Sequence, residues 1–239
     1  LGGASLIGLA WLAWRGDTPR QRQVALDALL GCGFILLWCM FLFTYLRATA
    51  VLHPATYDSI LYRFEQTLGA QFSALAARWV SAVPGLGTLL DVVYEYLAFG
   101  FAAVYGLTLR RRTTLPLNLM LLWALGGLGG FIAYHLLPAA GPRYLLGDLF
   151  PLYLPTATAM PATLSVVSPV PRNAMPSLHF GWILLLWAYA HLQGSRWVTR
   201  ACLLMLALTL TATLAKGEHY LTDLVVAMPF FAAILTAGL

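Results

Sequence analysis

Long apolar stretches that are almost free of charge are the feature of this sequence that most restricts its fold. Six of them are candidate membrane-spanning helices: Val24–Leu46, Leu86–Leu109, Leu115–Leu137, Ser177–Leu192, Ala201–Ala215 and Tyr220–Leu239. A helix needs about 20 mostly apolar residues to cross a bilayer. Strands of a membrane barrel alternate apolar and polar residues, whereas these stretches are continuous. The sequence therefore predicts an all-α, polytopic membrane helix bundle with six full transmembrane helices and a partial segment at Leu1–Trp14.

The composition supports a membrane protein and argues against several other classes. Of the 239 residues, 60% are hydrophobic and 10% are charged, whereas a soluble domain has about 25% charged residues. So little charge cannot cover a water-facing surface of this size, which excludes a soluble enzyme, a nucleic-acid binder and a disordered protein. The net charge of +5 suits a membrane protein with basic loops and does not require nucleic acid as a partner.

The positions of the arginines predict the orientation of the chain. The three tightest connections, Arg15–Gln23, Arg110–Thr114 and Gln193–Arg200, carry eight basic residues against a single acid, Asp17. All three fall on one side when the segments simply alternate across the bilayer. Because cytoplasmic loops collect Lys and Arg, we assign this side to the cytoplasm and expect a multi-pass cell-membrane protein. Arg110–Arg112 could instead bind anionic lipid headgroups.

The opposite, extracytoplasmic face receives two long connections. In the first, the apolar residues of Tyr57–Leu68 recur at helical spacing, which predicts an amphipathic helix lying in the membrane interface. The second, Ala139–Met175, is rich in proline, which disrupts regular helices and strands. Its many apolar side chains predict a packed lid over the bundle rather than a disordered loop.

Titratable groups collect at the outer end of the last predicted helix. His219 and Asp223 are four positions apart and therefore lie on one helix face. A carboxylate in that position can hold the imidazole in one tautomer and stabilise its charged form. This pair alone is a weak signal, because it also fits a hydrogen-bonded His–Asp pair at the interface with no catalytic role.

Two further segments reach the same depth on the same face. Pro176 favours a helix start, so we expect Ser177 and His179 in the first turn, where free backbone N–H groups attract anions. Arg143, which follows an outward-running helix, can bind the oxygens of a phosphate in a forked geometry. Two histidines, an aspartate and several cations at one level predict a phosphoryl-transfer site. One histidine can attack phosphorus and the other can protonate the leaving oxygen.

Two of these motifs carry a family resemblance. Met175-Pro-Ser-Leu-His179 and Gly217-Glu-His-Tyr-Leu-Thr-Asp223 resemble the motifs of the type 2 phosphatidic acid phosphatase superfamily. They look most like the branch that contains the inositol phosphorylceramide synthases and the sphingomyelin synthases. The resemblance covers the chain from about Leu86 to its end. We therefore expect one integral membrane domain over 1–239, with an N-terminal segment and basic loop (1–23), an interfacial region (47–85) and a catalytic core bundle (86–239).

The resemblance implies a role for each residue. His219 corresponds to the nucleophile that forms a phosphohistidine, Asp223 orients it, and His179 is the general acid. Arg143 matches the arginine of the family's first motif. No metal or other cofactor is expected, because cations take over the stabilisation of charge.

The sequence also departs from the family pattern. The phosphatases usually have glycine at the position of Leu178, and leucine there is typical of the transferase-like branch. The lysine of the first motif would fall near Leu136 and is absent. The Ser-Arg pair of the third motif would fall on Ala212 and Thr213, so its arginine is missing. Lys216 and Arg172 are possible substitutes for these missing cations. We assign phosphate binding to them together with Ser177 and Arg143.

Three other ionisable residues lie near the outer face. Asp91 and Glu95 are one turn apart and either line a polar cavity for an alcohol acceptor or simply lie at the interface. His135 is either part of that cavity or a packed, hydrogen-bonded histidine.

The leading functional hypothesis is a membrane phosphotransferase that moves a phospho-headgroup between lipid or polyol substrates at the extracytoplasmic face. The alternative is a lipid phosphate phosphatase, which uses the same site with water as the acceptor. A transporter with a His219–Asp223 proton relay would have ionisable residues deep in several helices. A metal hydrolase is disfavoured because the neighbouring cations would repel a divalent ion. The partners expected are lipid substrates, and the sequence does not fix the oligomeric state.

Overall fold

The computed structural model describes residues 18–97, 119–167, 169–192 and 196–237. Within these residues the chain is almost entirely helical, which confirms the all-α prediction. The elements are α2 (Pro19–Leu52), β1 (Ala55–Thr56), α3 (Asp58–Thr67), α4 (Phe72–Ala82), α5 (Leu86–Glu95), α7 (Leu119–Leu136), α8 (Pro142–Leu146), the 3-10 helices η1 (Gly147–Leu149) and η2 (Ala157–Ala159), β2 (Ser165–Val166), α9 (Leu178–Leu192), α10 (Arg196–Ala215) and α11 (Leu221–Ala237).

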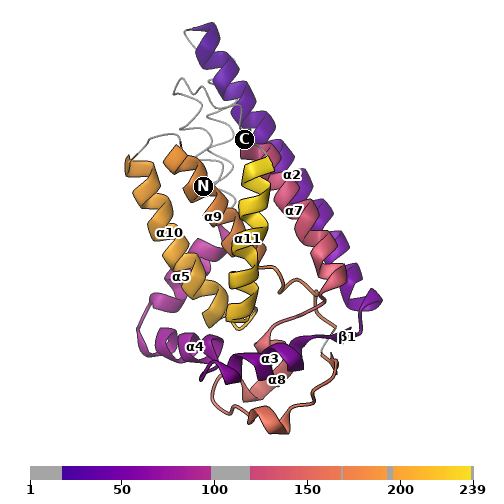
Figure 1. Cartoon of the computed structure of the whole chain (residues 1–239). Coiled ribbons are helices and arrows are strands. Elements are labelled where there is room, and N and C mark those ends of the chain that lie inside the picture. Colours follow the sequence, from indigo (N-terminus) through magenta and orange to yellow (C-terminus); the bar gives the residue numbers. More distant parts are fainter. Residues whose placement is uncertain (1–17, 98–118, 168, 193–195, 238–239) are drawn as a thin grey trace.

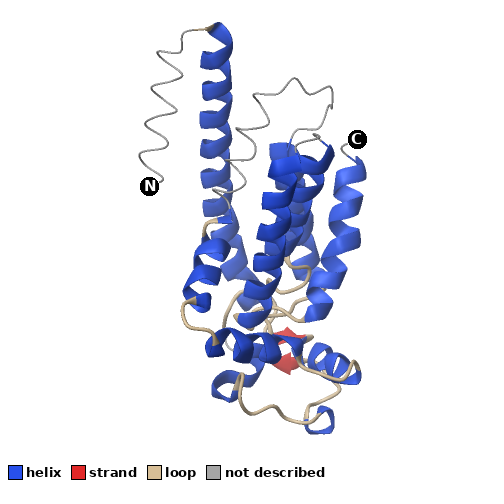
Figure 2. Ribbon diagram, turned by 90° about the vertical axis from the view of Figure 1, so that its left-hand side faces the viewer, coloured by secondary structure: helices blue, strands red, loops and turns tan. Residues whose placement is uncertain are grey.

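The long helices run side by side, and the short ones cover one end of the bundle (Figure 1). Helix α9 lies at the centre, where it packs against α10, α11 and α7, while α10 also packs against α4 and α5. Figure 2 shows α3, α4 and α8 and the two short strands gathered at the same end. The starts of α2 and α10 lie at the other end of the bundle.

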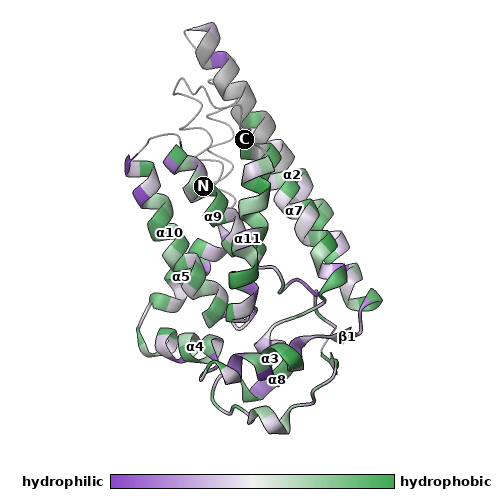
Figure 3. Cartoon of the chain, in the orientation of Figure 1, coloured by the Kyte–Doolittle hydropathy of each residue, from purple (hydrophilic) through white to green (hydrophobic). Residues whose placement is uncertain are grey.

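Apolar residues predominate in α9, as in its neighbours α7 and α11 (Figure 3), and in α9 they are spread over all sides of the helix. A helix of that kind has no face suited to water and is buried by its neighbours. Ile183, Leu185 and Leu186 are at most 1% exposed, and they form the middle of the largest hydrophobic cluster. Gly181 lets α11 come close, because a Cβ atom there would overlap the ring of Phe231. The fold thus fixes the first turn of α9 against α11.

Among the described residues, one helix, Arg196–Ala215, is long and apolar enough to cross a membrane by length and composition. Shorter apolar helices occur within Leu36–Leu52, Leu121–Leu136, Leu178–Leu192 and Leu221–Ala237. Six full transmembrane helices therefore remain a prediction. The segment Leu1–Trp14, the connections around Arg15 and Arg110–Arg112, and most of the second half of Leu86–Leu109 lie outside the described residues.

Several element boundaries differ from the sequence prediction: α2 begins at Pro19 and α10 at Arg196, each five residues before the expected start. Helix α2 runs to Leu52, six residues beyond the expected end, and stops before His53-Pro54, because the residue before a proline disfavours the helical conformation. The interfacial region contains not only the predicted helix, found at Asp58–Thr67, but also α4 over Phe72–Ala82. The alanine-rich sequence of α4 favours a helix, although no element is predicted over this segment.

The proline-rich connection packs against the rest of the molecule, as predicted for a lid. Tyr62 of α3, Leu146 of α8 and Tyr220 form a buried cluster, against which Phe150 and Leu154 of the connection pack. The connection also pairs β2 with β1 through Ala55 opposite Val166 and Thr56 opposite Ser165. The lid is thus attached to the interfacial helices.

Candidate functional site

The residues named from the two sequence motifs converge at the end of the bundle that α3, α4 and α8 cover (Figure 1). His219 lies in the short connection between α10 and α11, and Asp223 lies in the first turn of α11, so the prediction that both share one helix face is wrong. Their side chains still meet, because the connection turns directly into α11. His179 is in the first turn of α9. Ser177 was expected in the same turn, but α9 begins one residue later, at Leu178. Ser177 instead caps the helix, because its Oγ accepts the Phe180 N–H at 3.5 Å.

The connection between α10 and α11 is shaped by two local features. Gly217 adopts φ +69°, a left-handed conformation that glycine takes without strain and that turns the chain after Lys216. Asp223 Oδ2 accepts the Tyr220 N–H at 2.8 Å, which satisfies one of the free amides at the start of α11. The aspartate therefore fixes the backbone beside His219 as well as lying near its ring.

The hydrogen bonds of His219 define its tautomer. Its Nδ1 lies 2.9 Å from the Ala174 carbonyl oxygen and 3.5 Å from Asp223 Oδ2. A carbonyl oxygen can only accept, so Nδ1 carries the proton and Nε2 of the neutral ring has a free lone pair. This Nε2 lies 3.3 Å from Ser177 Oγ, which can donate to it. The imidazole is thus held with Nε2 toward the start of α9.

His179 has a neighbour that sequence reasoning missed. Its ring stacks on that of Tyr94, with the ring centroids 3.9 Å apart and an interplanar angle of 17°. The Tyr94 hydroxyl donates to Glu218 Oε2 at 2.8 Å, and the Lys216 ammonium lies 4.9 Å from the Tyr94 ring centroid. Tyr94 therefore links His179 to the segment that carries His219. A tyrosine inside an apolar stretch gives no signal of this contact, because its partners lie more than 80 residues away.

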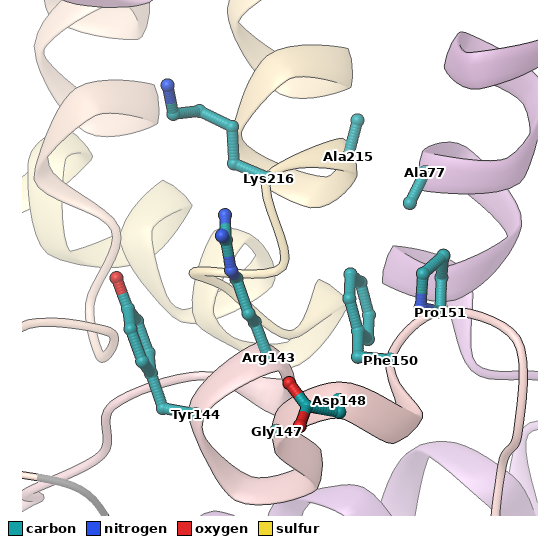
Figure 4. A pocket seen from close by; sticks show the side chains of 9 residues that line it. All are labelled: Ala77, Arg143, Tyr144, Gly147, Asp148, Phe150, Pro151, Ala215 and Lys216. Carbon is teal, nitrogen blue, oxygen red and sulfur yellow. The ribbon is translucent and has the colours of Figure 1, made fainter.

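A cavity of about 570 Å³ is formed by α8, the lid and the end of α10 (Figure 4), and neither His179 nor His219 is among its lining residues. The Arg143 and Lys216 side chains line it, and Figure 4 shows the Arg143 guanidinium and the Tyr144 hydroxyl extending in the same direction. The backbone holds this arm against the His219 segment, because the Arg143 N–H donates to the Gly217 carbonyl at 2.9 Å. The cavity combines two cations and one acid, Asp148, with apolar walls, among them Phe150, so its charged lining is positive by one. Such a lining can hold an anionic group that is attached to an apolar one.

Asp91 and Glu95 form ion pairs with Lys216 and are not among the residues that line the cavity. Lys216 Nζ lies 2.9 Å from Asp91 Oδ1 and 3.5 Å from Glu95 Oε1, and both acidic side chains are more than 60% exposed. Burial opposes the charge of Lys216, but the hydrogen bond and charge of Asp91, with Glu218 and Glu95, outweigh it, so the pKa of Lys216 is raised. The ammonium remains charged beside the cavity.

Two predicted residues lie apart from this group. Arg172 is buried, and its side chain donates to the carbonyl oxygens of His53 and Val170, each at 2.9 Å. In this structure the guanidinium thus binds backbone carbonyl groups of the protein, and a role of Arg172 in phosphate binding stays a prediction. His135 is hydrogen-bonded to His53, with 2.8 Å between the ring nitrogens, as expected for a packed histidine.

Comparison with known protein families gives one match. The model of the PAP2 superfamily matches residues 59–237, which include His179, His219, Asp223, Arg143 and Lys216. The chain belongs to the PAP2 superfamily. No curated protein and no solved structure gave a significant match. Membership in the PAP2 superfamily indicates phosphatase or phosphotransferase chemistry, and its members are typically membrane proteins.

Proposed function

We propose that this PAP2 superfamily member is a membrane phosphotransferase that moves a phospho-headgroup between lipid or polyol substrates through a phosphohistidine on His219. The observation that carries the proposal is the fixed tautomer of that histidine. The Ala174 carbonyl accepts a hydrogen bond from Nδ1–H and leaves Nε2 unprotonated, and the segment that carries His219 also carries Lys216, which lines a cavity together with Arg143. A nucleophile held in its reactive form beside charge-stabilising groups is what phosphoryl transfer requires.

The proposed reaction has two steps. In the first, His219 Nε2 forms a bond to phosphorus while the bond to the leaving oxygen breaks, and His179 gives that oxygen a proton. In the second, His179 takes the proton of an acceptor hydroxyl, whose oxygen attacks phosphorus and releases His219. Arg143 and Lys216 stabilise the charge on the phosphoryl oxygens in both steps, and Asp223 stabilises the positive charge on the His219 ring. This chemistry needs no metal ion.

The choice of acceptor separates the proposal from its alternative, a lipid phosphate phosphatase. Transfer requires that water be kept from the phosphohistidine until an alcohol arrives. The His219 side chain is 2% exposed, and the lid packs against this end of the bundle through Leu146 and Phe150. Leu178, in place of the phosphatases' usual glycine, supports the same choice. These features favour the branch that resembles the inositol phosphorylceramide and sphingomyelin synthases.

We also propose that the chain crosses the membrane several times, with the site on the extracytoplasmic face. Helix α10 supports this, because only 28% of its apolar window is buried and a core helix of a soluble protein would be mostly covered. Large apolar side chains of α2, including Leu37, Met40 and Phe43, are also exposed. Arg196 and Arg200 lie at the start of α10, at the end of the bundle opposite the site. Basic residues at that end support a cytoplasmic location for it.

Product analysis tests the proposal. Purified protein is incubated with a phospholipid labelled in its headgroup, with and without chelator, in the presence of diacylglycerol, ceramide and inositol-type acceptors. Mass spectrometry should find the headgroup on a lipid or polyol acceptor, in equal amounts with chelator. Release of free phosphate or phospho-headgroup alone would favour the phosphatase, and loss of activity with chelator would contradict the metal-free mechanism.

A further inference from the structure

Helix α3 carries two carboxylates that the mechanism does not use. Asp58 and Glu65 are both 0% exposed, although charged side chains are almost never fully buried without partners. Burying an ionised carboxylate is unfavourable unless hydrogen bonds compensate for the lost water. Their partners therefore indicate what these residues do.

Asp58 holds the backbone that leads into α8. Its carboxylate accepts the N–H groups of Ala140, at 2.9 Å, and of Gly141, at 2.7 Å. Gly141 is two residues before Arg143, and a Cβ atom at Gly141 would overlap the backbone of Glu218. Asp58 thus fixes the Arg143 arm where it touches the residue before His219.

Glu65 holds the start of α11. Its Oε1 accepts the Leu221 N–H, whereas Oε2 has no hydrogen-bond partner among the described residues. Leu221 and Thr222 begin α11, and the unpaired amides of a helix N-terminus favour a negative charge. The turn that Glu65 holds begins two residues after His219 and contains Asp223.

The two carboxylates are linked rigidly through α3. They are seven positions apart, about two helical turns, and so lie on the same side of the helix. Tyr220 lies between the two anchored segments, fully buried, and its hydroxyl donates to the Asp58 carbonyl oxygen at 3.1 Å. One helix therefore fixes the distance between the segment that carries Arg143 and the segment that carries His219.

From this geometry we propose that Asp58 and Glu65 are positioning residues that align Arg143 with His219 for the transfer reaction. The proposal rests on the proposed function for its catalytic consequence, but the anchoring itself is testable without activity. Asp58 acts on the phosphate-binding arm and Glu65 on the nucleophile arm. Their loss should therefore have different effects on substrate binding and on turnover.

The test compares Asp58→Asn and Glu65→Gln with Ser59→Ala as the matched control. Ser59 is a buried polar residue of the same helix, but its hydroxyl donates to Thr163 of the lid, at 2.6 Å, and not to a motif segment. At pH 8, where Glu65 is ionised, amide hydrogen exchange of the full chain in detergent should rise about tenfold at residues 140–143 in Asp58→Asn and at 221–223 in Glu65→Gln, because a neutral amide oxygen is a weaker acceptor than a carboxylate. Ser59→Ala should change neither segment.

The kinetic arm uses the labelled phospholipid. We expect Asp58→Asn to raise KM about tenfold with kcat nearly unchanged, and Glu65→Gln to lower kcat about tenfold with KM nearly unchanged. If the Asn or Gln variant does not fold, Asp58→Glu and Glu65→Asp, which shift the carboxylate by one methylene, should show the same pattern.

Two results would overturn the proposal. One is hydrogen exchange that rises equally over the whole chain, or equally in the Ser59→Ala control. The other is the same change in kcat and the same change in KM in both carboxylate variants. If the wild-type protein shows no phosphotransfer or hydrolysis, the proposed function fails, whereas the exchange experiment still decides whether the two carboxylates anchor their segments.

Discussion

At the scale of single residues, the site depends on backbone groups as much as on side chains. The sequence predicted that Asp223 would orient His219, and Asp223 lies near it, but the nearer partner of Nδ1 is the Ala174 carbonyl. Every residue has such a carbonyl, so no residue type in the sequence marks the one that will accept. The His–Asp spacing could be predicted because it is local, whereas the contacts of Ala174 and Tyr94 depend on how the helices pack.

Tyr94 gives a prediction at this scale. Tyr94→Phe keeps the ring that stacks on His179 and loses the hydrogen bond to Glu218, whereas Tyr94→Ala loses both. We expect kcat to fall about threefold in the Phe variant and a hundredfold in the Ala variant, because a general acid contributes about 10²–10⁴-fold only when it is correctly placed. Steady-state kinetics with the labelled phospholipid measures this. Equal losses in the two variants would show that the stacking does not position His179.

Gly141 gives a second prediction, which concerns the close contact between α8 and the segment that carries His219. Gly141→Ala places a Cβ atom at φ +110° against the backbone of Glu218, whereas Gly147→Ala, at φ +56°, meets nothing within 4 Å. The control should cost about 1–3 kcal/mol of unfolding free energy for its backbone alone, because φ +56° with ψ −130° is a conformation that glycine adopts and alanine disfavours. Gly141→Ala should cost several times more and reduce activity, because the Arg143 arm must move. Thermal unfolding in detergent compares the two, and similar costs would contradict the close approach.

At the scale of elements, the apolar helices were predictable and the covering layer was only partly so. Periodicity located α3 to within one residue at each end, and continuous apolar character located α9 and α11. Helix α4 was not predicted although its own sequence favours a helix, and the two-residue strands β1 and β2 were missed because their pairing depends on a contact with the lid. The burial of Asp58 and Glu65 was missed for the same reason, since they occupy the polar face of an amphipathic helix.

Glu65 makes the stability of this layer depend on pH. Burial, and next the charge of Asp223, raise the pKa of Glu65 from 4.5 to about 7. The unfolded chain releases this proton near pH 4.5, whereas the folded protein keeps it to about pH 7. The contribution of Glu65 to stability is therefore greatest below pH 4.5 and falls by on the order of 3 kcal/mol as the pH rises to 7.

Thermal unfolding between pH 4.5 and 8 measures this effect. Glu65→Gln cannot titrate, so its melting temperature should depend less on pH than that of the wild type. Ser59→Ala, on the same helix, should keep the wild-type dependence. A Glu65→Gln curve parallel to the wild type would mean that Glu65 keeps an ordinary pKa.

At the scale of the whole molecule, the fold separates two ends with different chemistry. The site lies at one end, and the starts of α2 and α10 lie at the other (Figure 1). The alternation of segments predicted this arrangement from the sequence, because consecutive helices must reverse direction. The number of helices that span the membrane does not follow from it.

Labelling with a membrane-impermeant maleimide tests the topology. The natural cysteines are first replaced, and then Thr67→Cys at the end of α3 and Arg196→Cys at the start of α10 are made separately; both positions are exposed. In intact cells Thr67→Cys should react, whereas Arg196→Cys should react only after the membrane is permeabilised. The reverse pattern would place the site in the cytoplasm.

The most direct test of the central claim is to isolate the phosphorylated enzyme. The protein is mixed with phospholipid labelled at phosphorus, quenched in base, and digested for mass spectrometry. We predict a base-stable, acid-labile phosphate on the peptide that contains His219, which disappears when an acceptor alcohol is added and the labelled product forms. Turnover at the wild-type rate by His219→Ala, or a phosphate located on another residue, would contradict the account.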